Sequence, residues 1–312
     1  MTRPVPWRPL AGVLQLLEPD LRCILAGNPS PLTGPGTNSY LLGARDLVVI
    51  DPGPDDPAHL AALLEAVPRG GSIRQIIVTH PHLDHCAGAA ALARLTGAAV
   101  LGFGDALSGR SAAMRALDLG GDLGGGEGLD IGYRPDLCLA DGAVTDTAAG
   151  PVEAVWTPGH CASHLCLGWR GVLFSGDQVM GWSTSLISPP DGDLGDYRRS
   201  LDRLGARRGA QQDRRYYPGH GAPVADPPAR LAALVLHRRK RERLVLAALA
   251  DDYRGIADLT ARAYADTPVA LHPAASRNLL AHLVDLVARN LAQADRPTGF
   301  SARFRRGPAA GE

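Results

Sequence analysis

Histidine and aspartate are concentrated in one short segment, residues 80–85, which reads HPHLDH. His80, His82 and His85 are three of the ten histidines in a chain of 312 residues, and Asp84 lies among them. Imidazole and carboxylate groups are the ligands that zinc and related divalent metals take in proteins. Four such ligands this close in sequence cannot easily surround one tetrahedral ion, so the segment favours two adjacent metal ions over one.

Three later segments carry a histidine or an aspartate directly after an apolar run. They are WTPGH with His160, LFSGD with Asp177 and YYPGH with His220. Taken singly, each is more often an ordinary turn with a solvent-facing histidine or a capping aspartate. Because α/β folds build their sites from loops at the ends of strands, we expect these three side chains to join the segment 80–85.

Two further residues are interpreted as supports of this cluster. Asp51 ends the run DLVVID, and we expect it to hold a histidine ring from behind, with a turn aspartate as the alternative. His164 follows His160 by four residues and is interpreted as a contact behind the ligands or as a substrate-facing group. His59 is expected to be exposed on a helix, and the other histidines are expected to be packing or surface groups: His237, His272 and His282.

The segments that must position these residues alternate between strand and helix patterns, which is typical of an α/β fold. Apolar runs predict strands at 37–43, 46–53, 72–80, 98–102, 151–156, 164–169, 171–177 and 214–221. Amphipathic patterns predict helices within 56–71, 86–97 and 196–207. The glycine-rich segment 120–132 follows no strand, so we expect a flexible surface loop or lid rather than a phosphate cradle.

Composition limits the class of protein. The formal net charge of +0 argues against binding nucleic acid or an anionic membrane through bulk charge alone. The five cysteines have irregular spacing and form no CxxC pair, which fits a reducing compartment. No run of about 18 apolar residues occurs, and residues 1–20 contain prolines and acids rather than a secretory signal. These features predict a cytoplasmic protein without a membrane span.

A proline-rich join at 222–229 separates two regions of different composition. We therefore predict a catalytic domain at 1–225 and a smaller, helical domain at 226–312. Residues 230–312 contain 14 arginines and lysines but only 8 acidic residues, and the segment HRRKRER holds much of this surplus of positive charge. The surplus is interpreted as a solvated helix face, with a basic face for RNA phosphates as the alternative.

The motifs THPHLDH, TPGH, FSGD and PGHG, in this order, resemble those of the metallo-β-lactamase superfamily of dinuclear metallohydrolases. The resemblance implies an αβ/βα sandwich of two mixed β-sheets with metal ions at one edge. It also implies that His80, His82 and His160 hold one ion, that Asp84, His85 and His220 hold the other, and that Asp177 bridges them.

The segments GPGTNSYLLG (34–43) and 237–286 are similar to the β-lactamase-like protein 2 branch of that family. That resemblance implies a winged-helix-like C-terminal domain, which would close over the active-site edge or mediate homodimerisation. One member of the branch is an endoribonuclease on single-stranded RNA, and related fungal members are thioesterases that act on carrier-bound polyketides.

The expected chemistry is hydrolysis by a hydroxide that bridges two divalent ions, because metal binding lowers the pKa of water toward ~7. Asp84 would orient this nucleophile as well as bind metal. Zinc is the expected metal, and manganese or iron would also fit histidine and carboxylate ligands. A thioester or ester is the expected substrate, with single-stranded RNA as the alternative and a metal-binding regulator without turnover as a third hypothesis. A thioesterase needs a narrow, mostly apolar pocket, which segments 181–193 and 120–132 would wall.

Overall fold

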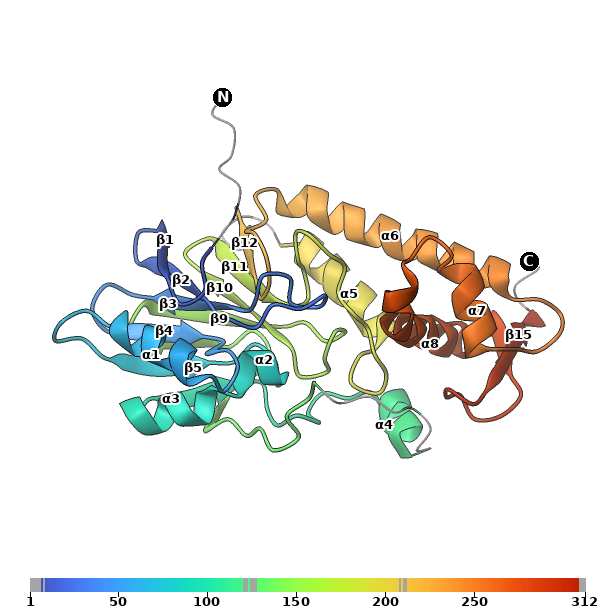
Figure 1. The fold of residues 1–312 in the computed structure, drawn as a ribbon, viewed down its shortest axis with the longest axis horizontal. Coiled ribbons are helices and arrows are strands. Elements are labelled where there is room, and N and C mark those ends of the chain that lie inside the picture. Colours follow the sequence, from blue (N-terminus) through green and yellow to red (C-terminus); the bar gives the residue numbers. More distant parts are fainter. Residues whose placement is uncertain are drawn as a thin grey trace, which may run out of the picture.

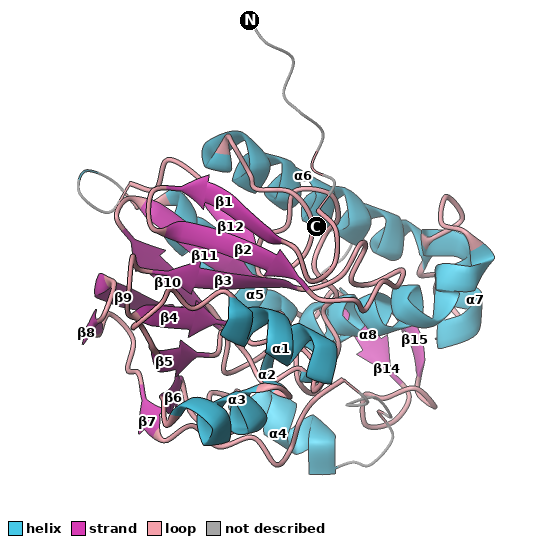
Figure 2. Cartoon of the chain, turned by 60° about the vertical axis from the view of Figure 1, so that its left-hand side comes forward, coloured by secondary structure: helices cyan, strands magenta, loops and turns pink. Residues whose placement is uncertain are grey.

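Two β-sheets lie face to face in the computed structural model, with helices on their outer faces (Figure 1, Figure 2). The structure describes residues 7, 9–119, 123, 128–207, 209 and 212–308. The first sheet has the strand order β1-β2-β3-β4-β5-β6-β7, in which β1 to β4 are antiparallel neighbours and β4 to β7 are parallel. Its strands are β1 (Leu14–Glu18), β2 (Leu21–Leu25), β3 (Asn38–Leu42), β4 (Leu47–Ile50), β5 (Ile73–Ile77), β6 (Ala99–Gly102) and β7 (Leu137–Cys138).

The second sheet has the order β12-β11-β10-β9-β8, and only its β11–β12 pair is parallel among the described strands. Helices α1 and α3 pack on the outer face of the first sheet, and α5 and α6 on that of the second. This arrangement confirms the expected αβ/βα sandwich. The elements are β8 (Val144–Thr147), β9 (Gly150–Trp156), β10 (Leu165–Trp169), β11 (Val172–Gly176), β12 (Tyr216–Pro218), α1 (Pro57–Glu65), α2 (Leu83–Cys86), α3 (Ala89–Thr96), α4 (Ala112–Leu119), α5 (Leu194–Gly205) and α6 (Pro227–Ala248).

Helix α6 connects the sandwich to the C-terminal region. Asp226 caps its first turn, where Pro227 needs no hydrogen-bond acceptor. Leu231 near its start packs with the second sheet, whereas Val245 near its end belongs to a separate C-terminal core. That core contains α7 (Ile256–Ala263), α8 (His272–Ala288) and a small sheet of β13 (Arg254–Gly255), β15 (Arg303–Arg306) and β14 (Ala292–Ala294), next to a short turn of 3₁₀ helix (Val269–Leu271).

Further predictions concern membrane spans, His59, the glycine-rich segment and the domain boundary. The described helices include none that is both long and apolar enough to cross a bilayer. His59 is buried, so the expectation that it is exposed was wrong: its Nε2 lies 2.8 Å from the Ser39 hydroxyl, under the loop at Gly53. In the glycine-rich segment, 120–122 and 124–127 lie outside the described residues. The boundary near 226 stays a prediction.

The core between the two sheets contains an aromatic cluster. The Phe174 ring lies 5.0 Å from that of Tyr40 and 5.7 Å from that of Tyr217, and all three side chains are buried. Phe174 belongs to β11, whose end carries Asp177. The packing of this cluster therefore fixes a strand that serves the site.

Replacing Phe174 by alanine should lower the free energy of unfolding by about 3–5 kcal/mol, because the change leaves a cavity between two sheets. Phe174→Leu should cost less, since it keeps most of the volume. Urea unfolding followed by circular dichroism measures both losses. Leu95→Ala, at a position 63% exposed on α3, serves as control and should change stability by no more than about 0.5 kcal/mol. An equal loss in Phe174→Ala and the control would contradict this account of the core.

Candidate metal centre

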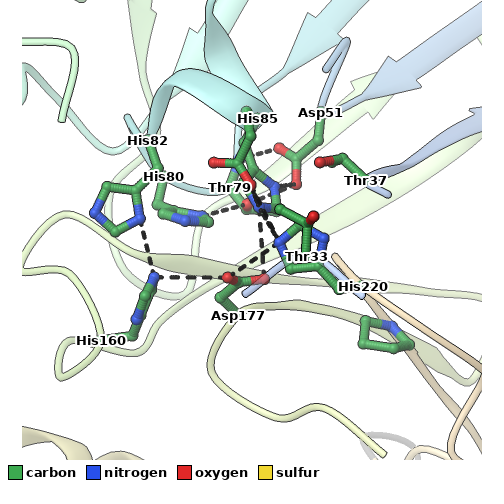
Figure 3. Close-up of polar contacts among 12 residues, drawn as sticks. Thr33, Thr37, Asp51, Thr79, His80, His82, His85, His160, Asp177 and His220 are labelled. Atoms are coloured by element: carbon green, nitrogen blue, oxygen red, sulfur yellow. Dashed lines mark hydrogen bonds and ion pairs between the residues drawn. The ribbon is translucent and has the colours of Figure 1, made fainter. Parts of the chain in front are cut away.

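The seven predicted ligand residues converge, although they come from four separate segments. Figure 3 labels six of them, all except Asp84. Each segment follows a strand, so the strand ends bring the side chains together. Residues 83–86 form the one-turn helix α2, which turns Asp84 and His85 away from the extended backbone of His82. The residues are His80 and His82 after β5, Asp84 and His85 in α2, His160 after β9, Asp177 after β11 and His220 after β12.

One group consists of His80, His82 and His160, whose ligand atoms lie within 4.8 Å of one another. Nδ1 of His82 lies 3.0 Å from Nε2 of His160, and Nε2 of His80 is buried with no hydrogen-bond partner among the described residues. Burial, reinforced by neighbouring imidazoles, lowers the pKa of His82 to about 3 and that of His80 well below its ordinary value. The rings are therefore neutral, which is the form that binds metal.

A second group consists of Asp84, His85 and His220. Nε2 of His220 lies 3.2 Å from Nε2 of His85 and 3.2 Å from Oδ2 of Asp84. Burial opposes the charging of His220, but the carboxylates of Asp177 and Asp84 outweigh it and raise the pKa of His220 well above its ordinary value. The two neighbouring carboxylates thus favour positive charge at this point.

Asp177 lies between the two groups. Its Oδ2 is 3.3 Å from Nε2 of His220 and 3.7 Å from Nε2 of His160, and its Oδ1 is 3.5 Å from Nε2 of His85. Oδ1 is buried and accepts no hydrogen bond from the described residues. One carboxylate therefore faces ring nitrogens of both groups.

Asp51 lies behind His85. Its Oδ2 accepts a hydrogen bond from Nδ1 of His85 at 2.9 Å, and its Oδ1 accepts one from the Thr79 backbone N–H at 2.7 Å. Asp51 adopts a φ of 51°, which is uncommon for a residue other than glycine. Because Nδ1 of His85 is engaged, Nε2 is the nitrogen that faces the site.

His164 lies behind Asp177 rather than at the pocket. Its Nε2 accepts the Asp177 backbone N–H at 3.2 Å, and its Nδ1 lies 2.9 Å from the Thr157 hydroxyl. A Cβ at Gly176 would come within 2.5 Å of Nε2, so this contact requires glycine. Of the two interpretations of His164, the structure agrees with the contact behind the ligands.

Two supports of the cluster were not predicted. The buried Asn38 donates from Nδ2 to the carbonyls of Pro218 and Gly221, at 3.0 and 2.9 Å, and so fixes the turn that carries His220. Asn38 lies in segment 34–43, whose similarity to the family could have pointed to a role for this residue at the site. The second support is the backbone carbonyl of Leu186, which accepts a hydrogen bond from Nδ1 of His160 at 2.7 Å. A backbone acceptor leaves no signal in residue type.

A pocket of about 410 Å³ opens onto the cluster. Segment 181–193 contributes to its wall, as do Gly128 and Leu129 at the described end of the glycine-rich segment. Arg277 of α8 is the one lysine or arginine among the described residues that line the pocket. The apolar lining residues are Pro31, Leu32, Leu129, Met180 and Leu186.

Comparison with known proteins agrees with this geometry. Residues 32–220 match the family model of the metallo-beta-lactamase superfamily, and residues 256–297 match the beta-lactamase associated winged helix domain. The beta-lactamase-like protein 2 homolog of Drosophila melanogaster is 31% identical over 89% of this chain and 90% of its own. The atrochrysone carboxyl ACP thioesterase of Aspergillus fumigatus is 30% identical over 76% of this chain and 67% of its own.

A solved structure, that of a metallo-beta-lactamase family protein from Thermus thermophilus, superimposes with a TM-score of 0.74. It is 26% identical in sequence and covers 93% of this chain and 100% of its own. The likeness extends over both the sandwich and the C-terminal region.

Replacing Gly219 by alanine should weaken the binding of divalent metal by about tenfold or more, because the site loses its ligand geometry. The new Cβ would come 2.4 Å from Cε1 of His85 and 2.6 Å from Oδ1 of Asp177, so both side chains must move. Competition with a chromophoric chelator measures the affinity. Gly205→Ala, where a Cβ meets no atom within 4 Å, is the matched control. Unchanged affinity in folded Gly219→Ala would show that the ligand positions are not those described.

Proposed function

The chain belongs to the metallo-β-lactamase superfamily, and on that premise we propose that it is a dinuclear metal-dependent hydrolase of a thioester or ester. The observation that carries the proposal is the convergence of five imidazoles and two carboxylates in one cluster, part of which lines a pocket. A decayed site that only senses metal would be expected to have lost some of these ligands, so turnover is favoured over a regulatory role.

The side chains fit a pair of divalent ions. Ring nitrogens that approach one another at 3.0–3.2 Å, together with a buried ring nitrogen and a buried carboxylate oxygen without a hydrogen-bond partner among the described residues, support this assignment because divalent cations would satisfy them. We assign His80, His82 and His160 to one ion, and Asp84, His85 and His220 to the other. Asp177 would bridge both. The donors are nitrogen and oxygen, which suits zinc and also accommodates manganese or iron.

Asp84 is the residue that we assign to the nucleophile. When bound, the two ions would lower the pKa of water toward ~7 and polarise the oxygen of the scissile bond. The Asp84 side chain is 30% exposed at the pocket, against 11% for Asp177, so it is the carboxylate better placed to accept a proton from the attacking water. Asp51 and His164 keep His85 and Asp177 directed at the same point.

Two buried cysteines that follow predicted ligands in the sequence, Cys86 and Cys161, are poorly suited to a covalent mechanism. Cys161 is buried near the pocket residue Leu129, and burial raises the pKa of its thiol to about 11. Burial also raises the pKa of Cys86. Since a thiolate is the reactive form, direct attack by activated water is the better-supported route.

The apolar part of the pocket wall favours a substrate with an apolar acyl group. A relative that is 30% identical is named a carboxyl ACP thioesterase, which supports a thioester as the substrate class. The RNA alternative receives no comparable support. In the segment HRRKRER, Arg238 and Arg241 are buried, and the exposed Arg239, Lys240 and Arg243 do not line the pocket. Arg241 instead donates to the Ala263 carbonyl and to Asp266.

Purified protein should contain about two divalent ions per chain and hydrolyse members of a thioester panel, while single-stranded RNA stays intact. Asp84→Ala should lower kcat by about 10²-fold or more, because it removes both a ligand and the proton acceptor. Elemental analysis and thiol-release assays measure these quantities. Asp55→Ala, an exposed aspartate before α1, is the control and should keep metal and activity.

Chelation should abolish hydrolysis, and added zinc should restore it. A wild-type protein that binds no zinc, manganese or iron would overturn the proposal. Hydrolysis of RNA but of no thioester would replace the substrate class and leave the metal centre standing.

A further inference from the structure

The segment 185–187 lies between the metal centre and the C-terminal helices. At the centre, Nδ1 of His160 donates to the carbonyl of Leu186 at 2.7 Å. A carbonyl can only accept, so the proton is on Nδ1 and the lone pair of Nε2 is directed at His82 and Asp177. The position of the Leu186 carbonyl therefore sets both the tautomer and the direction of the His160 ring.

The backbone on both sides of Leu186 is bound by two side chains, Arg238 of α6 and Asn278 of α8. Nη2 of Arg238 donates to the Ser185 carbonyl. Oδ1 of Asn278 accepts the Ile187 backbone N–H at 3.1 Å and also accepts Nη1 of Arg238 at 3.2 Å. The two side chains thus form one clamp around the peptide groups that carry Leu186.

This clamp is buried, and Arg238 makes several contacts within it. Arg238 is only 3% exposed, and its guanidinium stacks over the Tyr197 ring at 4.9 Å. Its planar fork reaches two acceptors at once, which a lysine ammonium cannot do in the same geometry. Ser185 lies equally deep, and its hydroxyl donates to the backbone carbonyl of Asp177 at 2.5 Å.

Segment 181–193 contains no helix or strand, so the regular backbone hydrogen bonds of a helix or sheet do not fix Leu186. A second arginine of α6, Arg230, also donates to this segment, from Nη2 to the Ser183 carbonyl. The wall of the pocket is therefore held from outside, by side chains that come after the predicted boundary at 226.

We infer that Arg238 and Asn278 are positioning residues of the metal centre, which direct His160 through the Leu186 carbonyl. The inference rests on the proposed function, since it requires an ion at the group of His80, His82 and His160. It gives the C-terminal region a part in building the site, beyond covering the pocket.

The test uses the full chain loaded with Co²⁺, whose visible spectrum reports ligand geometry. In Asn278→Ala, one of the two bound ions should lose about 10–100-fold in affinity, and its absorption bands should shift, because His160 is no longer directed. The other ion should keep its affinity. Chelator competition and absorption spectroscopy measure both effects.

Matched variants separate positioning from general stability. Asn278→Asp keeps an acceptor for the Ile187 N–H and for Arg238, so it should keep the wild-type spectrum. Arg239→Gln, at an exposed neighbour on α6, should also keep it. Arg238→Lys retains the charge but not the fork, so it should shift the spectrum as Asn278→Ala does, and it serves if Asn278→Ala does not fold.

A folded Asn278→Ala or Arg238→Lys with wild-type Co²⁺ affinity and spectrum would overturn the inference while leaving the metal centre intact. Failure of the wild-type chain to bind Co²⁺ at all would instead remove the proposed function, and the inference with it. The two failures are thus distinguishable in the same titration.

Discussion

The rest of the structure depends on two carboxylates placed among five imidazoles. Asp177 is buried and the Asp84 side chain is 30% exposed, and removal of a charge from water costs several kcal/mol unless an opposite charge compensates it. The pKa values of the neighbouring histidine rings shift in opposite directions. His82 and His160 have lowered pKa values because burial dominates there, whereas the carboxylates raise the pKa of His220. Positive charge is thus favoured beside the acids and disfavoured among the three rings of the first group.

Such a site needs a scaffold that does not relax, and the strand ends provide one. Each segment that contributes a ligand is held by the backbone or side chain of another segment. Asp51 in its left-handed conformation binds both Thr79 and His85, and Asn38 binds the turn of His220. Gly219 has no room for a side chain, because the ligands themselves occupy that space.

The residue types and their spacing were enough to predict an α/β fold and to single out the seven side chains that converge, whereas the sandwich followed from the family resemblance. Strand-end position was the useful signal, since it is visible in an apolar run followed by a turn. Contacts to backbone carbonyls were not predictable, because any residue can present a carbonyl; Leu186 is the example. Burial was also misjudged where polarity suggested exposure. His59 was expected at the surface, but Ser39 gives its ring a buried partner.

Arg238 is a case in which the sequence pattern was ambiguous for a physical reason. In a run such as HRRKRER, a solvated helix face and a buried arginine look the same, since only the acceptors around the guanidinium distinguish them. Those acceptors come from residues about 40–50 positions away in the chain. Helix α6 also packs on two different cores along its length, through Leu231 and Val245, so its apolar residues need not follow a single stripe. The packing of the sandwich therefore continues into the C-terminal region. Removal of that region would take α6 away from the second sheet and would also release segment 185–187. The composition of the sequence changes near 226, but the contacts that hold the site extend across that position.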